Sequence, residues 1–197
     1  DDLRMGPSGP DEYLRHSYVE RVDSADRVVT NDDPLVQRPS GYEQMNMMQK
    51  LRFRPNNHWD INYGFHYSTT TNYSRYDRLL RTKNGLPRSA EWYYGPQEWM
   101  MNNLSVTNNR NSGIYDQFTI RLTHQFFEES RHDRDFNKTE FRHRVEKVNV
   151  LAANFDFTKA LTANQSIMYG IEYVFNDVNS TGTDEDISTG TVVEGPA

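Results

Sequence analysis

Alternating hydrophobic and polar residues divide much of the chain into predicted β-strands. The clearest example is "WDINYGFHYS", residues 59–68, in which large apolar side chains occupy every second position. Successive side chains of an extended strand point to opposite faces, so this two-residue period predicts a strand with two different environments. Its apolar face consists of Trp59, Ile61, Tyr63, Phe65 and Tyr67.

Five further segments repeat this pattern with differing clarity: residues 44–53, 97–107, 117–126, 151–157 and 167–175. In the segment 97–107, Trp99 and Met101 are in one phase, whereas Leu104 and Val106 are in the other. Such a change of phase predicts a bulge or a shift of register. The six segments together predict an all-β protein.

The predicted connections alternate between short and long. "RPNNH", "NNRNSGIYD" and "TKALTANQ" are short and rich in turn residues, whereas "DRLLRTKNGLPRSAEWYYGP" and "EESRHDRDFNKTEFRHR" are long and polar. In an antiparallel up-and-down arrangement, this alternation places all short turns at one end of the sheet. Outer-membrane β-barrels have this organisation, with short periplasmic turns and long external loops.

Alternation alone does not distinguish lipid from a protein core, and a soluble β-sandwich satisfies it equally well. The asymmetry of the loops and the placement of aromatic residues near both strand ends favour a transmembrane β-barrel. The predicted lipid-facing residues are Trp59, Ile61, Tyr63, Phe65, Tyr67, Phe118, Ile120, Leu122, Ile167, Tyr169, Ile171 and Tyr173. The predicted interior-facing residues are Asp60, Asn62, His66, Arg121, Gln125, Asn154, Asp156 and Glu172.

Six strands are too few to close a bacterial outer-membrane barrel, which needs about eight or more. An open transmembrane sheet would also leave two edges unpaired in lipid. We therefore expect an antiparallel up-and-down segment of a larger barrel. The predicted organisation is an external loop region at 1–43, a transmembrane segment at 44–177 with three short turns and two long loops, and a flexible external loop at 178–197.

Composition narrows the classes of protein further. The chain has 35% hydrophobic residues, a mean hydropathy of −0.91 and no apolar run long enough for a transmembrane helix. A barrel remains possible because only alternate strand residues meet lipid. The net charge of −6 argues against nucleic-acid binding, and the absence of Cys excludes disulfides and Cys-based sites.

Several blocks resemble one family. "VTNDDPLVQRPSGYEQMNMMQK", "YSTTTNYSRYDRL", "AEWYYGPQEW", "HQFFEESRHDRDF" and "VLAANFDFTK" are similar to the barrel of TonB-dependent outer-membrane receptors, particularly the Bacteroidetes-type iron or haem receptors. The resemblance covers most of residues 10–177, and "YYGPQEW" and "QFFEESRHDR" are its most specific parts.

The resemblance implies a 22-stranded barrel in the bacterial outer membrane with an amino-terminal plug domain. It also implies uptake of an iron chelate, haem or another small nutrient, energised by the TonB complex. This sequence contains no plug domain, no recognisable TonB box and only about six predicted strands, so we expect it to be an internal part of such a barrel. A passive outer-membrane channel remains an alternative.

Two predicted external loops contain candidate ligand-binding residues. Trp92, Tyr93 and Tyr94 offer exposed aromatic surface for a ligand, or else anchor their loop at the membrane interface. The second loop contributes a set of cationic and imidazole side chains that suits anionic chelates, haem propionates or lipopolysaccharide phosphates. These are Arg131, His132, Arg134 and His143. The alternative is a solvated loop whose charges are balanced by Glu128, Glu129 and Asp133.

No enzyme motif is present. The chain lacks HExxH or other close metal spacing, a serine nucleophile elbow, a P-loop and a dinucleotide-binding turn. "DVNSTGTDEDIS" is rich in oxygen donors but lacks the EF-hand spacing, which favours a flexible acidic loop. We therefore predict no catalytic residues, no cofactor and no metal site.

Overall fold

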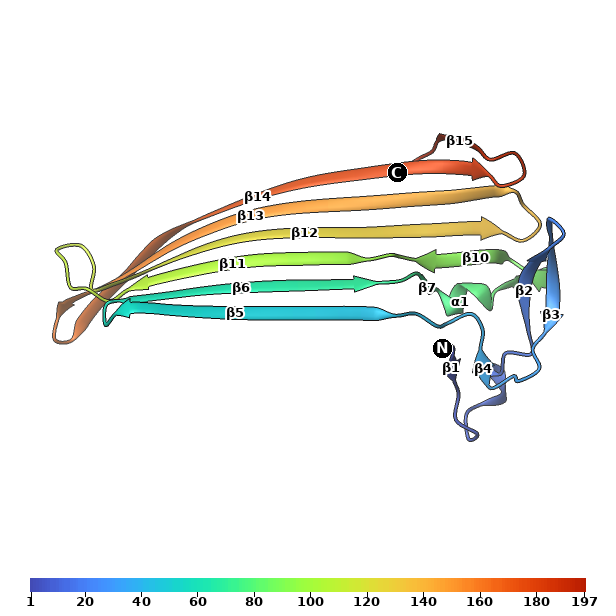
Figure 1. Cartoon of the computed structure of the whole chain (residues 1–197), viewed down its shortest axis with the longest axis horizontal. Coiled ribbons are helices and arrows are strands. Elements are labelled where there is room, and N and C mark those ends of the chain that lie inside the picture. The colour runs from blue at the N-terminus through green and yellow to red at the C-terminus, as the bar shows by residue number, and fades with distance from the viewer.

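One long antiparallel sheet dominates the computed structural model, which describes all 197 residues (Figure 1). Its strands follow the order β15-β14-β13-β12-β11-β6-β5, so neighbours in the sequence are mostly neighbours in the sheet. The six principal strands are β5 (Gln44–Asn56), β6 (Trp59–Thr70), β11 (Glu98–Asn108), β12 (Gln117–Asp135), β13 (Glu140–Thr162) and β14 (Gln165–Asp186). The prediction of an antiparallel all-β fold is confirmed.

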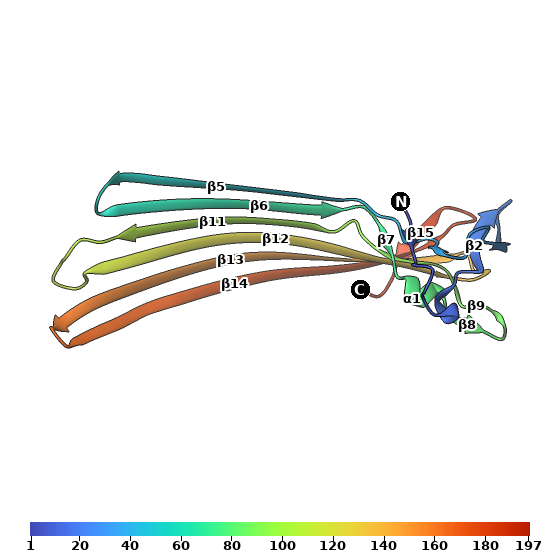
Figure 2. The same cartoon turned by 90° about the horizontal axis from the view of Figure 1, so that it is seen from below.

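The sheet is open. Strand β5 is one edge, and β14 is covered only at Thr183–Asp186 by the short β15 (Thr191–Glu194). The two edges do not pair with each other, so the described residues form no closed barrel. Figure 2 shows the sheet as a single twisted layer.

The connections lie as the alternation predicts at one end of the sheet. Residues 57–58, 109–116 and 163–164 join β5 to β6, β11 to β12 and β13 to β14, and all three lie together at the left of Figure 1. We call the opposite end of the sheet the far end. There residues 71–97 form β7 (Tyr73–Ser74), α1 (Tyr76–Leu79), β8 (Thr82–Lys83), β9 (Leu86–Pro87) and β10 (Ser89–Tyr94). The one α-helix, α1, has four residues, and no helical segment has the length and hydropathy of a membrane span.

The two faces of the sheet differ along its whole width. The register aligns one row of residues across β6, β11, β12, β13 and β14. In that order the row consists of Trp59, Asn108, Phe118, Phe157 and Tyr169. The same register brings all twelve predicted lipid-facing residues to one face, called here the apolar face. On the opposite, polar face, Arg121, Asn154 and Glu172 lie side by side.

The apolar face carries a row of aromatic rings near the short turns. The centroids of Trp59 and Phe118 are 5.8 Å apart, those of Phe118 and Phe157 are 6.1 Å apart, and those of Phe157 and Tyr169 are 5.2 Å apart. Tyr115, in the connection 109–116, also packs edge-on against Phe118 at 5.0 Å. Aromatic pairs at these separations interact favourably.

Strand β11 corrects the prediction of a bulge. It pairs with both β6 and β12 without any shift of register. Met100, Leu104 and Val106 therefore lie on the apolar face, whereas Trp99 and Met101 lie on the polar face. The pattern misleads because Asn102 occupies an apolar-face position, where its Oδ1 accepts a 2.6 Å hydrogen bond from the Tyr63 hydroxyl.

Strands β12, β13 and β14 are longer than predicted. The connection between β12 and β13 is only residues 136–139, so Arg131, His132, Arg134 and His143 lie on strands and not in a long loop. Likewise β14 continues past residue 177 to Asp186, through a stretch predicted to be a loop. The sequence conceals these extensions because both faces are largely polar there, which removes the two-residue contrast.

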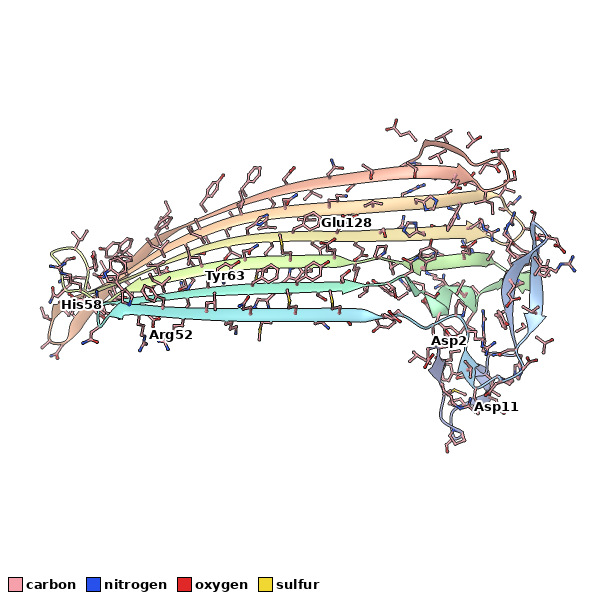
Figure 3. The ribbon with its side chains drawn as sticks, viewed as in Figure 1. Asp2, Asp11, Arg52, His58, Tyr63 and Glu128 are labelled. Atoms are coloured by element: carbon pink, nitrogen blue, oxygen red, sulfur yellow. The ribbon has the colours of Figure 1, made fainter.

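The sheet has almost no core of its own. Only 11 of the 197 residues are buried, and Leu79 and Ala90 are the only hydrophobic side chains among them. No element covers the apolar face between the short turns and the far end, where Figure 3 shows the side chains standing free. Leu122, Ile171 and Tyr173 are 44%, 68% and 62% exposed.

The first 43 residues form small elements at the far end (Figure 1). Strand β1 (Leu3–Arg4) pairs with β4 (Val36–Gln37), η1 (Asp11–Tyr13) is a short 3-10 helix, and β2 (Ser17–Val22) and β3 (Ala25–Thr30) form a hairpin. Asp23 and Ser24 at the hairpin turn both have positive φ, as a two-residue type I′ turn requires. The region predicted as an external loop therefore contains defined secondary structure.

One buried ion pair fastens this hairpin to the sheet. Both guanidinium Nη atoms of Arg134 donate to the Asp26 carboxylate, at 2.7 and 2.9 Å, and Arg134 Nε donates to Glu91 at 2.9 Å. The backbone N–H of Asn137 donates to the same Asp26 carboxylate at 2.7 Å. The Arg134 and Asp26 side chains are 1% and 0% exposed. We call these contacts the Asp26–Arg134 anchor.

The anchor makes docking of the hairpin sensitive to acid. Burial alone would raise the pKa of Asp26, but the hydrogen bonds from Arg134, Asn137 and Arg21 outweigh burial and lower it. A lowered pKa in the folded state gives stability that is present above the ordinary carboxyl pKa, about 3.9, and is lost as the pH falls through the lowered value. Amide exchange of residues 17–30, corrected for intrinsic rates, should accelerate only below about pH 4.

Asp26→Asn is the matched variant, because it keeps the size of the side chain but removes its charge. Exchange of residues 17–30 should then be fast at pH 7 and nearly independent of pH. Protection equal to that of the natural chain at pH 7 would contradict the anchor.

Candidate functional site

The far end of the sheet gathers the candidate ligand residues. Strand β10 lies beside β12, with Tyr93 opposite His132 and Tyr94 opposite Arg131. His132 is in turn opposite His143 on β13. The structure therefore brings together residues that are up to 50 positions apart in the sequence. Because successive strand residues alternate, it also divides them between the two faces.

On the polar face, Trp92 and Tyr94 contact two arginines that sequence analysis did not select. The Arg75 guanidinium carbon lies 5.2 Å from the Trp92 ring centroid and 5.8 Å from that of Tyr94, and Arg78 lies 5.7 Å from Trp92. The two rings meet edge-on at 5.0 Å. Cations over aromatic faces at these distances are stabilised by the ring quadrupole. We call Arg75, Arg78, Trp92 and Tyr94 the arginine–aromatic cluster.

The short helix α1 positions this cluster. Arg75 and Arg78 are three residues apart around the beginning of α1, a spacing that brings side chains to one side of a helical turn. Asp77 forms two hydrogen bonds with Arg75, at 2.7 and 3.1 Å, and these raise the pKa of Arg75. The repeated arginines in "SRYDRLLR" are the only signal for this arrangement in the sequence, because residues 71–97 have no regular period.

Arg131 extends the cationic surface next to the arginine–aromatic cluster. It is exposed and has no carboxylate within ion-pair distance, whereas its neighbour Arg144 is paired with Asp184 at 2.9 Å. Arg131, Arg144 and Tyr94 line a hollow of about 230 Å³ together with Glu129 and Ser180. An unpaired guanidinium beside aromatic rings is well suited to an anionic group carried on a planar ligand.

The opposite face holds a second group of residues, which we call the histidine cluster. The Nδ1 atoms of His132 and His143 are 2.6 Å apart, and His143 Nε2 lies 3.3 Å from a Glu185 carboxylate oxygen. Tyr93 stacks on His132 at 4.7 Å, and Phe141 lies 4.4 Å from His143. Burial and the neighbouring His143 lower the pKa of His132, which favours a neutral ring near pH 7.

Arg134 has a structural role in place of the predicted ligand-binding one. Its guanidinium is enclosed by the Asp26–Arg134 anchor and is 1% exposed, so it offers no surface to a ligand. Sequence analysis grouped it with Arg131 because the two are close in a charged stretch. On a strand, however, residues 131 and 134 lie on opposite faces.

A separate hollow of about 540 Å³ lies midway along the polar face. Gly64, which has no side chain, leaves space between Lys50, His66 and Met101. Nearer the short turns, Arg52 and Arg54 both pair with Asp60, the latter at 2.9 Å. The polar face is therefore both hollowed and rich in hydrogen-bonding groups.

No group of three or more His, Asp or Glu residues is arranged to hold a metal ion. No protein-family model, curated protein or solved structure matches the chain. Function is therefore inferred from the geometry of the sheet, from its two clusters and from the resemblance of the sequence blocks.

Arg131 and Arg134 provide a direct comparison of the two roles. Arg134→Ala leaves the buried Asp26 with only Arg21, at 3.3 Å, as an ion-pair partner and should weaken attachment of the hairpin by about 3 kcal/mol. Arg131→Ala removes an exposed, unpaired charge and should change stability by less than about 0.5 kcal/mol. Limited proteolysis of the N-terminal region, measured across a urea series, distinguishes them. Equal losses in both variants would refute the assignment.

Proposed function

We propose that the sheet is part of the wall of a bacterial outer-membrane β-barrel of the TonB-dependent receptor type. The barrel would take up a small nutrient such as an iron chelate or haem. The observation that carries this proposal is the uncovered apolar face, which extends over six adjacent strands. Large contiguous apolar surfaces are rare on soluble monomers, because their contact with water is unfavourable.

In a soluble β-sandwich, a second sheet would cover the apolar face and remove it from water. Within this chain no second layer packs against the apolar face, and the residues that would form the sandwich core are exposed or half-buried, none of them buried. Lipid hydrocarbon is the alternative cover. The dimensions support it: eight steps along β12 from Phe118 to Phe126, at about 3.4 Å each, give about 27 Å along the strand. A tilted strand of about 9–11 residues is long enough to cross a bilayer.

The residues at the two ends of this apolar band also support contact with lipid. Near the short turns it is bordered by the aromatic row that includes Trp59, Phe118 and Tyr169. Toward the far end it gives way to Glu128 beside Lys147, which are joined by a 3.1 Å ion pair. Aromatic residues border the apolar band of outer-membrane barrels, and charged residues lie beyond it.

The free edges of β5 and β14 require partners in a membrane, since unsatisfied backbone groups are very unfavourable in hydrocarbon. We infer that further strands of the same barrel pair with both edges. The polar face would then line the interior and contact water or a plug domain. The extended ends of β12, β13 and β14 would project beyond the membrane on the external side.

The arginine–aromatic cluster and Arg131 would lie on the interior side of this external projection. Guanidinium groups pair with carboxylates and phenolates, and the rings of Trp92 and Tyr94 offer flat apolar contact. This chemistry supports capture of an anionic, ring-bearing chelate or of haem. Energised passage through the barrel rests on the resemblance to TonB-dependent receptors.

Membrane insertion can be tested with two neighbouring substitutions. Leu122→Arg places a charge at the centre of the apolar face and should destabilise the inserted barrel by about 2–4 kcal/mol. Thr123→Arg introduces the same side chain on the polar face and should have a much smaller effect. Folding of the full-length protein into lipid vesicles, followed by urea titration, measures the difference. Equal effects at the two positions would contradict a lipid-facing surface.

Transport can be tested in cells that express the full-length protein. Uptake of a radiolabelled anionic iron chelate should require TonB, and Arg131→Ala should reduce its binding about tenfold, the effect of losing one charged hydrogen bond. Arg110→Ala, in the short connection at the other end, is the matched control and should bind normally. Uptake that persists without TonB would favour a passive channel.

A further inference from the structure

The histidine cluster places two imidazoles in an unusual arrangement. His132 and His143 are directly opposed on β12 and β13, and their Nδ1 atoms are only 2.6 Å apart. Two ring nitrogens this close require that one carry a proton and the other offer a lone pair. Strands β12 and β13 pair without a break on both sides of these two residues, and only residues 136–139 connect the strands. The sheet therefore fixes the positions of both histidines.

Glu185 on β14 orients one of the two rings. Its carboxylate accepts a 3.3 Å hydrogen bond from His143 Nε2, which places the proton on Nε2 and leaves the Nδ1 lone pair directed at His132. Histidines that bind metals characteristically donate their second ring N–H to a carboxylate or a carbonyl in this way. Glu185 therefore prepares His143 as a ligand.

Two aromatic rings limit rotation of the imidazoles. Tyr93 stacks on His132 with an interplanar angle of 25°, and Phe141 packs at 4.4 Å against His143. The His143 side chain nevertheless remains 21% exposed, so solvent reaches the site. Fixed rings with an open side satisfy two requirements for binding an ion from solution.

We propose that His132 and His143 form a two-histidine site for a divalent transition-metal ion, with Cu²⁺ bound most tightly. Metal–imidazole bonds of about 2.0 Å in adjacent corners of a square plane place the two nitrogens about 2.8 Å apart, close to the separation in this structure. In tetrahedral coordination of Zn²⁺ the two nitrogens would be about 3.3 Å apart, so the rings would have to move further. Binding moves the shared proton to His132 Nε2, and water completes the coordination.

This site is separate from the one proposed for nutrient capture. The histidine cluster lies on the face that continues the apolar face, about 20 Å along β12 beyond Phe126. The arginine–aromatic cluster lies on the opposite face. Metal binding therefore does not depend on a role in transport, and either proposal can fail without the other.

The test is titration of the purified full-length protein with Cu²⁺ in detergent micelles, followed by calorimetry and electron paramagnetic resonance. We expect the histidine cluster to bind one Cu²⁺ ion. The electron paramagnetic resonance spectrum of this ion should show hyperfine coupling to two nitrogens. His132→Gln and His143→Gln should each weaken this binding at least tenfold. Glu185→Gln, which keeps both ligands but loses the orienting charge, should weaken it about tenfold.

His58→Gln is the matched control, because His58 is exposed and lies in the connection 57–58 at the opposite end of the sheet (Figure 3). It should bind Cu²⁺ as the natural chain does. Circular dichroism establishes that each variant retains its β-structure, and a variant that unfolds is replaced by His→Asn at the same position. Equal Cu²⁺ affinity in folded His132 and His143 variants, or a spectrum with a single nitrogen, would overturn the proposal.

Discussion

The organisation of this protein depends on covering one broad apolar face. Each of six long strands contributes alternate large hydrophobic side chains to the same side, and the register holds these in rows across the sheet. A sheet of this kind must pack against another layer or against lipid. Because the chain supplies no second layer, we propose lipid as the cover, and a segment of membrane barrel would then account for the loop asymmetry, the aromatic row and the two free edges.

A different kind of interaction holds the far end together. There the buried side chains are mainly polar, including Arg15, Asp26, Asn31 and Arg134, and the Asp26–Arg134 anchor joins elements 108 residues apart. Buried ion pairs give specificity of geometry but leave a costly unpaired charge when one partner is lost. The N-terminal elements therefore have a defined position on the sheet without a substantial hydrophobic core.

Sequence periodicity predicted the parts of the fold in which the two faces differ in polarity. The strands around Trp59, Phe118 and Ile171, and the short turns between them, follow directly from it. It failed where the contrast disappears: at Asn102, whose amide is satisfied by Tyr63, and along Arg131 to Asp135, where both faces are polar. The separation of the candidate residues into two clusters needed the register, which pairs Tyr93 with His132. The side-chain contacts then add Arg75 and Glu185, neither of which was selected from the sequence as a ligand-binding residue.

The most direct test of the account is a periodic scan for contact with lipid. These 197 residues contain no cysteine, so a single cysteine can be introduced at each of positions 118–126 on β12 and spin-labelled in lipid vesicles, with any cysteine elsewhere in the full-length protein replaced by serine. Accessibility to oxygen, which concentrates in hydrocarbon, should be high at 118, 120, 122, 124 and 126, and accessibility to a water-soluble nickel chelate should be low there. The intervening positions should show the opposite. Low oxygen accessibility at both sets would mean that protein, and not lipid, covers the apolar face.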